Sequence, residues 1–309
     1  MKSALVLVPL AFLFGCVTGP VEDHGDEALG QTEQRWEAES PTNDAESTHL
    51  YIAERAVSLL GQHGELDAAR AMNKLLGDAR CLPRWQQGLY DADWYAEYSD
   101  NGAWFPGDPL PHSTTGWKSH FYDPDTGKNF AGETKPTART RAATYWSDAR
   151  AKIDSGDLNG GCYSLGLALH YVTDVTQPMH AANFTAKSNP LLLHSHWEGW
   201  AMGLHGRAIA ADWSGAPSTL KTDSVFVANA RASKSQWSGI QTAIDNAYKA
   251  NCHVYTAFYA WADTGYESCW NADPTVTTKS IASMVTAQDL TAKWLYAAYF
   301  ELKTGSAWR

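Results

Sequence analysis

Two pairs of potential metal ligands lie close together in the second half of the chain. His170 and Asp174 are four residues apart, and His194 and Glu198 repeat that spacing fourteen residues after His180. Residues i and i+4 share one face of a helix, so each pair can offer a nitrogen and an oxygen to one cation. A proline ends the first helix just before His180, which leaves His180 within reach of the same helix end. This spacing predicts a metal site.

A single His–Asp pair is more often a salt bridge or a helix cap than a metal site. Two such pairs with a histidine between them are far less expected by chance. Other histidines are not expected to bind metal: His196 lies on a different helical face from His194, and His112, His205 and His253 have no partner at ligand spacing.

The charge balance restricts what such a site could act on. The chain has 34 acidic and 24 basic residues, a formal charge of −10. Proteins that bind nucleic acid through its backbone need an excess of Lys and Arg, so no nucleic-acid partner is expected. A phosphate-containing substrate would need bound cations to offset its charge.

The N-terminal segment predicts export. Lys2 precedes an apolar run, 4–15, that is too short to cross a bilayer and is typical of a signal peptide over residues 1–16. Leu13–Cys16 resembles a bacterial lipoprotein box, so Cys16 is either lipidated or lost with the signal. Residues 17–35 are acidic and polar, as in a propeptide or tether. We therefore expect a secreted protein or an envelope-anchored lipoprotein.

The rest of the chain predicts an all-α fold in a single multi-helix globular domain, with the metal cluster in a cleft. Apolar residues recur at helical spacing in Thr48–Leu60, Leu66–Leu76, Thr137–Ile153, Gly161–Val175, Ser238–Ala262 and Ile281–Leu302. Between them, Trp85–Phe130 is predicted to be a long aromatic-rich loop because it is rich in Gly, Pro and Asp. After export, Cys81, Cys162, Cys252 and Cys269 allow three disulfide pairings, of which Cys252–Cys269 is favoured.

The segment around His170 resembles the signature of the zinc-dependent bacterial phospholipases C of the phosphatidylcholine-preferring type. The residues that fit are His170, Tyr171, Thr173, Asp174, Val175, Pro178, His180 and Asn183, while Thr176 stands where Asn, Asp, Ser or His is usual. Asn183 also begins a glycosylation triplet, but its place in the signature favours a structural role. Similar blocks occur at HSHWE and at Ser119–Lys128, and the resemblance extends in scattered blocks over residues 36–309. It implies that these residues form a zinc-dependent phospholipase C catalytic domain.

The resemblance also implies processing of the N-terminus. Family members use the free amine and carbonyl of an N-terminal Trp as a metal ligand, with a His thirteen residues later. Here Trp36 follows Arg35 directly, and His49 lies thirteen residues beyond Trp36. An amine in a peptide bond has no lone pair to donate, so cleavage after Arg35 would complete a metal site and activate a precursor.

Matched position by position, the resemblance implies three zinc ions. The first is held by Asp93, His120, His170 and Asp174, the second by His180, His194 and Glu198, and the third by Trp36 and His49, with Asp174 bridging to the first. Asp93 is chosen from an aromatic-rich segment in which Asp91 is the alternative. This nitrogen and oxygen donor set, with open positions, suits catalytic zinc.

Such a cluster can offset phosphodiester charge and lower the pKa of a bound water, so that hydroxide attacks phosphorus. The expected reaction releases diacylglycerol and phosphocholine from phospholipid at a membrane or micelle surface, with Asp93 as a candidate general base. Glu39, Trp94 and Trp117 match the family's headgroup pocket, in which a carboxylate and aromatic faces suit a quaternary ammonium.

Two alternatives remain open. Single-strand-specific zinc nucleases share this ligand plan, but they usually have a longer gap between the ligands at positions 180 and 194, and Asp in place of Glu198. A non-catalytic lipoprotein that binds zinc or a lipid surface would keep the ligands and lose the pocket. We expect a monomer without a C-terminal β-sandwich, since the helical pattern ends near Leu302. Interfacial contact would then come from aromatic loops, such as Trp104 and Phe105.

Overall fold

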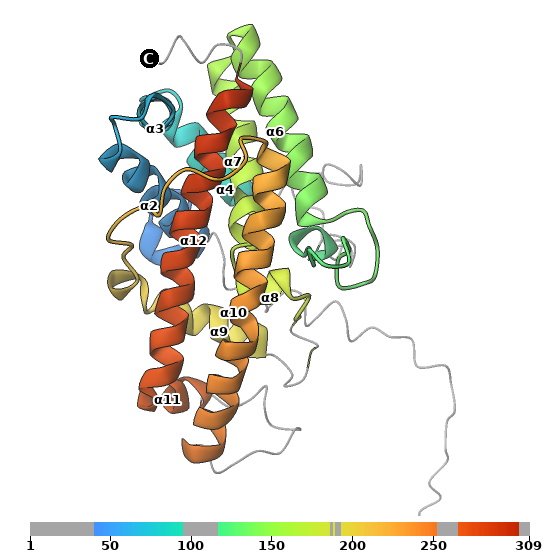
Figure 1. Ribbon diagram of the computed structural model, residues 1–309, viewed down its shortest axis with the longest axis vertical. Helices are drawn as coiled ribbons and strands as arrows, with labels where there is room; N and C mark the ends of the chain where they lie inside the picture. The colour runs from blue at the N-terminus through green and yellow to red at the C-terminus, as the bar shows by residue number, and fades with distance from the viewer. Residues whose placement is uncertain (1–39, 95–116, 186–187, 189–192, 252–264, 303–309) are drawn as a thin grey trace, which may run out of the picture.

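The computed structural model describes residues 40–94, 117–185, 188, 193–251 and 265–302, and within these residues the fold is all-helical (Figure 1). An isolated β-bridge joins Asp123 and Lys128. None of the helices described is both long and apolar enough to cross a membrane. The helices are η1 (Asp44–Glu46), α2 (Thr48–Gln62), α3 (Asp67–Leu76), α4 (Leu82–Trp94), η2 (Trp117–His120), α6 (Ala138–Ser155), α7 (Leu158–Asp174), α8 (Pro178–Ala181), α9 (Leu193–Met202), η3 (His205–Arg207), α10 (Thr222–Asn251), α11 (Gly265–Ala272) and α12 (Pro274–Glu301).

The six segments with helical periodicity are helical where the structure describes them, with shifted ends. α10 begins at Thr222, well before the predicted start at Ser238, and residues 252–262 of that prediction lie outside the described residues. α12 likewise begins early, at Pro274, because Asp273 caps its first turn by accepting a hydrogen bond from the Thr275 backbone N–H.

The predicted loop Trp85–Phe130 is wrong at its start, because α4 extends to Trp94. Its Pro83 and Gly88 disfavour a helix interior in isolation, but a proline in the first turn is tolerated. Gly88 has a packing reason to be there: a Cβ at this position would lie 2.1 Å from the Tyr163 carbonyl oxygen of α7. Tertiary packing therefore stabilises a helix that the local pattern does not indicate.

α7 is largely buried, and it packs against both α4 and α6. Every residue from Ser164 to Asp174 is buried, as expected for a helix that is covered on all sides. Gly166 allows the same close approach as Gly88, since a Cβ there would lie 2.0 Å from the Trp85 carbonyl oxygen. The two glycines bring the backbones of α4 and α7 into direct contact.

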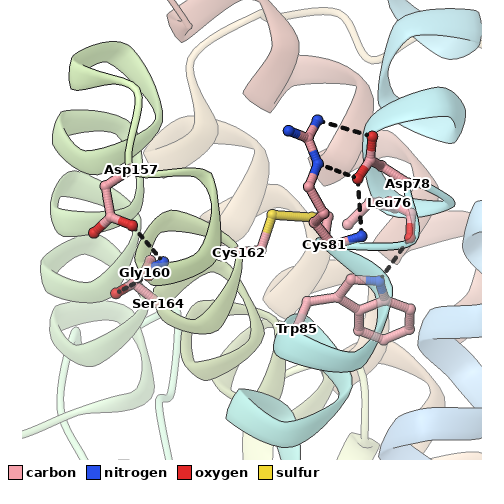
Figure 2. Close-up of a disulfide and its surroundings, with 9 residues drawn as sticks. Leu76, Asp78, Cys81, Trp85, Asp157, Gly160, Cys162 and Ser164 are labelled. Atoms are coloured by element: carbon pink, nitrogen blue, oxygen red, sulfur yellow. Dashed lines mark hydrogen bonds and ion pairs between the residues drawn. A yellow bond between two sulfur atoms is a disulfide. The ribbon is translucent and has the colours of Figure 1, made fainter.

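A disulfide joins Cys81, at the start of α4, to Cys162, near the start of α7 (Figure 2). On the same side of α4, the Trp85 indole N–H donates to the Leu76 carbonyl oxygen at 3.0 Å. Cys269 is also disulfide-bonded, and Cys252, its favoured partner, lies outside the described residues. The first bond is compatible with the favoured pairing.

The long helices α10 and α12 lie side by side (Figure 1). Trp294 of α12 packs its ring edge-on against Trp146 of α6, with ring centroids 5.5 Å apart. At the other end of α12, Trp197 of α9 donates its indole N–H to Ser280. The hydrogen bond from Trp197 holds α9, and with it HSHWE, against α12.

Candidate metal centre

Three groups of histidine and carboxylate side chains converge at one end of α7. In each group the potential ligand atoms lie within 4.8 Å of one another. The groups are His49, His170 and Asp174; Asp93, His120 and His170; and His180, His194 and Glu198. The structure therefore brings together eight of the nine predicted metal ligands, while Trp36 lies outside the described residues.

Six helices supply these side chains. α2 contributes His49 from its first turn, and α4 contributes Asp93 from its last turn. The remaining side chains come from η2 (His120), α7 (His170 and Asp174), α8 (His180) and α9 (His194 and Glu198). Pro178 ends the α7 segment as predicted and also opens α8, which turns His180 back toward α7.

Asp174 is the centre of the arrangement and is fully buried. Its Oδ2 lies 2.9 Å from His120 Nδ1, and its Oδ1 lies 3.1 Å from His180 Nδ1. His49 Nε2 is 3.7 Å from the same Oδ1. This carboxylate therefore faces histidines of all three groups, as a bridging ligand would.

Asp93, rather than Asp91, faces the cluster. Asp93 Oδ1 is 3.2 Å from His170 Nε2 and 3.8 Å from His120 Nδ1. Asp91 instead accepts hydrogen bonds from the Gln87 amide at 2.7 Å and the Tyr163 hydroxyl at 2.9 Å. The geometry therefore favours Asp93 as the potential ligand and gives Asp91 a structural role.

Gln177 orients the ligand group formed by His180 of α8 and by His194 and Glu198 of α9. His194 Nε2 lies 3.0 Å and His180 Nε2 lies 3.4 Å from Glu198 Oε1. The same oxygen accepts a hydrogen bond from the Gln177 amide at 2.9 Å, and Gln177 also caps α8 by accepting from the His180 backbone N–H. Gln177 therefore orients two members of the group at once.

Neighbouring oxygen atoms orient the imidazoles of α2 and α7. His170 Nδ1 donates to the Leu89 carbonyl oxygen at 2.9 Å, which leaves the lone pair of Nε2 directed at Asp93 and His120. His49 Nδ1 lies 2.6 Å from the Thr173 hydroxyl, so its Nε2 faces Asp174. Such outer contacts hold a metal-binding histidine in one tautomer and orientation.

Sequence reasoning did not identify these supporting residues. Gln177 had a usable signal, since a polar residue directly before a helix-opening proline is a typical N-cap. Leu89 acts through its backbone carbonyl, which carries no mark in the sequence. Thr173 lies within the signature, which by itself indicates no role for its hydroxyl group.

Burial and mutual charge shift the pKa values of the cluster. Burial alone would raise the pKa of Asp174, but the neighbouring imidazoles, His120 foremost, hold it well below its ordinary value. Burial likewise opposes ionisation of Glu198, yet the histidines of its group lower its pKa to about 2. Burial disfavours a charged His180, but Asp174 and Glu198 raise its pKa to about 9. Burial and a neighbouring imidazole lower the pKa of His49 to about 3.

The buried carboxylates are therefore ionised, and His180 carries a proton that a bound cation would displace. Three buried atoms also form no hydrogen bond among the described residues: Glu198 Oε2, and Asp174 Oδ1 and His194 Nε2, which have only the ion-pair contacts given above. Unsatisfied buried polar atoms are costly, and coordination to a metal ion would satisfy them. The donor set and these atoms fit bound divalent cations.

Two histidines that were not expected to bind metal lie outside the three groups. His205 is buried and stacks on the Tyr51 ring with centroids 4.3 Å apart, and its Nε2 lies 3.1 Å from the Thr48 hydroxyl. His196 is half-buried on α9. Asn183 has a φ of 54° and donates its amide to the Lys128 carbonyl oxygen at 3.2 Å, in agreement with a structural role.

Several predictions fall on residues that the structure does not describe. Glu39, Trp104, Phe105, His112 and His253 lie outside the described ranges, as do residues 1–16 and 17–35. Trp94 and Trp117 end α4 and begin η2, but their side chains are likewise outside the description. The predicted headgroup pocket therefore stays a prediction.

No family model matches the chain. Two solved structures share its fold: the alpha toxin from Clostridium absonum has a TM-score of 0.55 at 20% identity and covers 84% of this chain and 65% of that one. The alpha-toxin of Clostridium perfringens from avian strain SWCP has a TM-score of 0.56 at 19% identity and covers 85% of this chain and 65% of that one. The helical fold and the three ligand groups thus define a helical protein with potential metal sites.

Relatives of known function indicate which kind of metal-binding protein this chain resembles. A phospholipase C of Bacillus cereus is 33% identical over 180 residues, which are 57% of this chain and 56% of that protein. A phospholipase C of Listeria monocytogenes is 31% identical over 181 residues, 59% of this chain and 57% of that protein. The matches thus span little more than half the length of these relatives. They confirm the resemblance to the bacterial phospholipases C that the motifs indicated.

Proposed function

We propose that this chain is a secreted, zinc-dependent phosphodiesterase that hydrolyses phosphatidylcholine-like phospholipids to diacylglycerol and phosphocholine. The observation that carries the proposal is the convergence of three histidine and carboxylate groups around the buried carboxylate of Asp174. The relatives named phospholipase C support the same reaction. In this proposal residues 36–309 form the catalytic domain, after a signal peptide and a propeptide.

The proposed ligands are those that the resemblance implies, with Asp93, His120, His170 and Asp174 for one ion, His180, His194 and Glu198 for a second, and Trp36 and His49 with Asp174 for a third. Imidazole nitrogen with carboxylate oxygen is a donor set that suits zinc. When bound, zinc supplies positive charge for the phosphate oxygens and lowers the pKa of a nearby water. This local charge is what the acidic chain, at −10, otherwise lacks.

The chain's own residues prepare the site for this reaction. Asp93 has 10% of its side chain exposed, against 1% for Asp174, so it is the more accessible of the two carboxylates. Burial would raise the pKa of Asp93, but the nearby histidines, His170 foremost, lower it, so the carboxylate is ionised at neutral pH. We assign Asp93 the role of proton acceptor at this edge of the site. The contact between Leu89 and His170 keeps that edge in a fixed orientation.

The proposed headgroup pocket and the proposed N-terminal cleavage both involve residues whose side chains the structure does not describe. Glu39, Trp94 and Trp117 would receive the quaternary ammonium of the headgroup, since a carboxylate and aromatic faces attract a cation that cannot donate hydrogen bonds. Cleavage after Arg35 would free the Trp36 amine. The nearness of His49 to Asp174 supports this cleavage. A third ion held by these two side chains needs further ligands, and the freed Trp36 amine would supply one. Intact mass of the secreted protein tests the cleavage: a start at Trp36 is expected.

The proposal is tested by exchanging Asp174 for Asn in the secreted, processed protein. We expect phosphocholine release from monomeric short-chain phosphatidylcholine to fall roughly 1,000-fold, since a loss of about 4 kcal/mol in transition-state stabilisation corresponds to that factor. The matched control is Asp212→Asn, which removes an exposed carboxylate that pairs with His63. Its activity should stay within about twofold, as for most surface changes.

The wild-type protein is assayed on single-stranded DNA in parallel. Cleavage of DNA without release of phosphocholine would replace the proposal with the nuclease reaction. Zinc bound in stoichiometric amounts without turnover of either substrate would favour a non-catalytic binding protein. Full activity in a protein that contains no zinc would refute the metal-dependent reaction itself.

A further inference from the structure

The segment between η2 and α6 carries an exposed aromatic ring on a well-ordered turn. Phe130 is 39% exposed, whereas its neighbour Asn129 is 1% exposed. The Asn129 side chain accepts hydrogen bonds from the backbone N–H groups of Ala131 and Glu133, each at 3.0 Å, and donates to the Pro136 carbonyl oxygen at 2.8 Å. The turn is thus held by a buried polar residue, and Phe130 projects from it into solvent.

Phe130 is linked to the candidate metal centre by one intervening ring. It packs edge-on against Phe121, with centroids 5.0 Å apart. Phe121 in turn stacks on the His180 imidazole at 4.5 Å and lies 5.8 Å from the ring of His194. An apolar path therefore leads from the exposed ring to the ligand group on α8 and α9.

Two lysines lie on either side of Phe130 in the sequence. Lys128 and Lys135 are exposed, and neither has an ion-pair partner among the described residues. The acidic side chains of the same segment are already paired: Glu133 with Lys118 at 2.9 Å, and Asp123 and Asp125 with Lys234 at 2.6 and 2.7 Å. With their two partner lysines included, the charged side chains of this segment are four lysines and three carboxylates, so the segment is locally positive by about one charge on a chain with a formal charge of −10.

A single exposed aromatic residue is ordinary on a protein surface. The combination here is different, because an aromatic tip on a fixed turn, flanked by free lysines, has the composition of a membrane-contacting surface. Figure 1 shows the segment between η2 and α6 at the outside of the domain, beside α6.

We propose that Phe130, Lys128 and Lys135 form a docking surface for bilayers that contain anionic phospholipid. The phenyl ring enters the interface, and the two lysines contact lipid phosphates on either side of it. Docking in this way holds the group on α8 and α9 at the depth of the phosphates, so that a lipid can reach it without leaving the bilayer entirely. The role in catalysis rests on the proposed phospholipase function, whereas docking itself does not.

Docking is measured by co-sedimentation with vesicles of phosphatidylglycerol and a phosphonate analogue of phosphatidylcholine, which the enzyme cannot hydrolyse. We expect Phe130→Ser to weaken binding about tenfold, since burial of an aromatic ring contributes strongly at an interface. Lys128→Gln with Lys135→Gln should weaken it about fivefold per lysine on anionic vesicles and leave binding to vesicles without phosphatidylglycerol unchanged. Added salt should reduce only the lysine contribution.

Matched controls separate docking from general surface effects. Phe300 is 47% exposed at the end of α12, far from α8 in Figure 1, so Phe300→Ser should bind vesicles as the wild type does. Lys74→Gln with Lys279→Gln makes the same change in net charge at exposed sites on α3 and α12. Binding by Phe130→Ser equal to that of the wild type, or an equal loss in the control variants, would overturn the proposal.

Hydrolysis of monomeric dihexanoyl phosphatidylcholine distinguishes this proposal from the proposed function. If the wild type hydrolyses the monomer and Phe130→Ser loses activity only on vesicles, docking serves catalysis. If the wild type binds vesicles but hydrolyses neither substrate, the phospholipase function fails and docking stands. A loss of monomer hydrolysis by Phe130→Ser equal to its loss on vesicles would place the ring in the site itself and contradict docking.

Discussion

Asp91 and Asp93 are two residues apart on α4, yet their carboxylates have different neighbours. Asp93 faces His170 of the candidate metal centre, and Asp91 accepts hydrogen bonds from Gln87 and Tyr163. We expect Asp93→Asn to lower the zinc content and to reduce phospholipid hydrolysis at least about 100-fold, as loss of a ligand or a proton acceptor does. Zinc analysis and turnover of soluble phosphatidylcholine measure both effects.

The same exchange at Asp91 is the control. Asp91→Asn should keep its zinc and its activity within about threefold, and should lower the free energy of unfolding by about 1 to 2 kcal/mol, because it weakens two hydrogen bonds to a buried carboxylate. If Asp91→Asn lost zinc while Asp93→Asn kept it, the assignment of the two carboxylates would be reversed.

Short spacings made part of the centre predictable from the sequence. His170 with Asp174, and His194 with Glu198, are each one helical turn apart, so periodicity alone places each pair on one face. His49, Asp93 and His120 come from three other helices, and no local rule places them beside His170; only the resemblance indicated them. Contacts through backbone atoms, such as that of the Leu89 carbonyl, depend on how helices pack and leave no local pattern.

At the scale of helices, close packing between α4 and α7 positions Asp93 beside His170. Gly166 lets the two backbones meet, because a Cβ there would lie 2.0 Å from the Trp85 carbonyl oxygen. Gly166→Ala should therefore force the helices apart and lower the free energy of unfolding by about 1 to 3 kcal/mol, the usual cost of overpacking. Urea unfolding measures the loss, and zinc content reports whether Asp93 has moved.

Gly206→Ala is the matched control, since a Cβ there meets nothing within 4 Å. Its free energy of unfolding should change by less than about 0.5 kcal/mol, as for ordinary surface changes. An equal loss in both variants would show that the close approach of α4 and α7 has no special importance.

Gly88, which packs against the Tyr163 carbonyl oxygen of α7, helps to explain why the sequence pattern predicts a loop where α4 forms. Helix periodicity identifies segments whose apolar residues recur on one face, and this worked for α2, α3, α6 and α7. In α4, glycine at a helix–helix contact counts against a helix in any local reading, although in the folded protein it permits the packing that stabilises the helix. Such a segment is recognised only when its partner helix is known.

Across the whole molecule, the Cys81–Cys162 disulfide fixes the register of two parallel helices. The bond joins residues 81 positions apart, and the hydrogen bond from His170 to Leu89 spans the same separation two turns further on. α4 and α7 therefore stay in register from the disulfide to the metal centre. A disulfide also agrees with the predicted export, since oxidising compartments allow such bonds to persist.

Closing a loop of this length restricts the unfolded chain strongly. Cys81→Ala with Cys162→Ala should therefore lower the free energy of unfolding by about 4 kcal/mol. Because the ligands lie at the opposite ends of α4 and α7, the folded double variant should keep its zinc and most of its activity at 25 °C, with its urea midpoint clearly reduced. Equal urea midpoints for the wild type and the double variant would show that the disulfide contributes nothing to stability. Loss of zinc from the folded double variant would show that helix packing alone cannot keep Asp93 in register with His170.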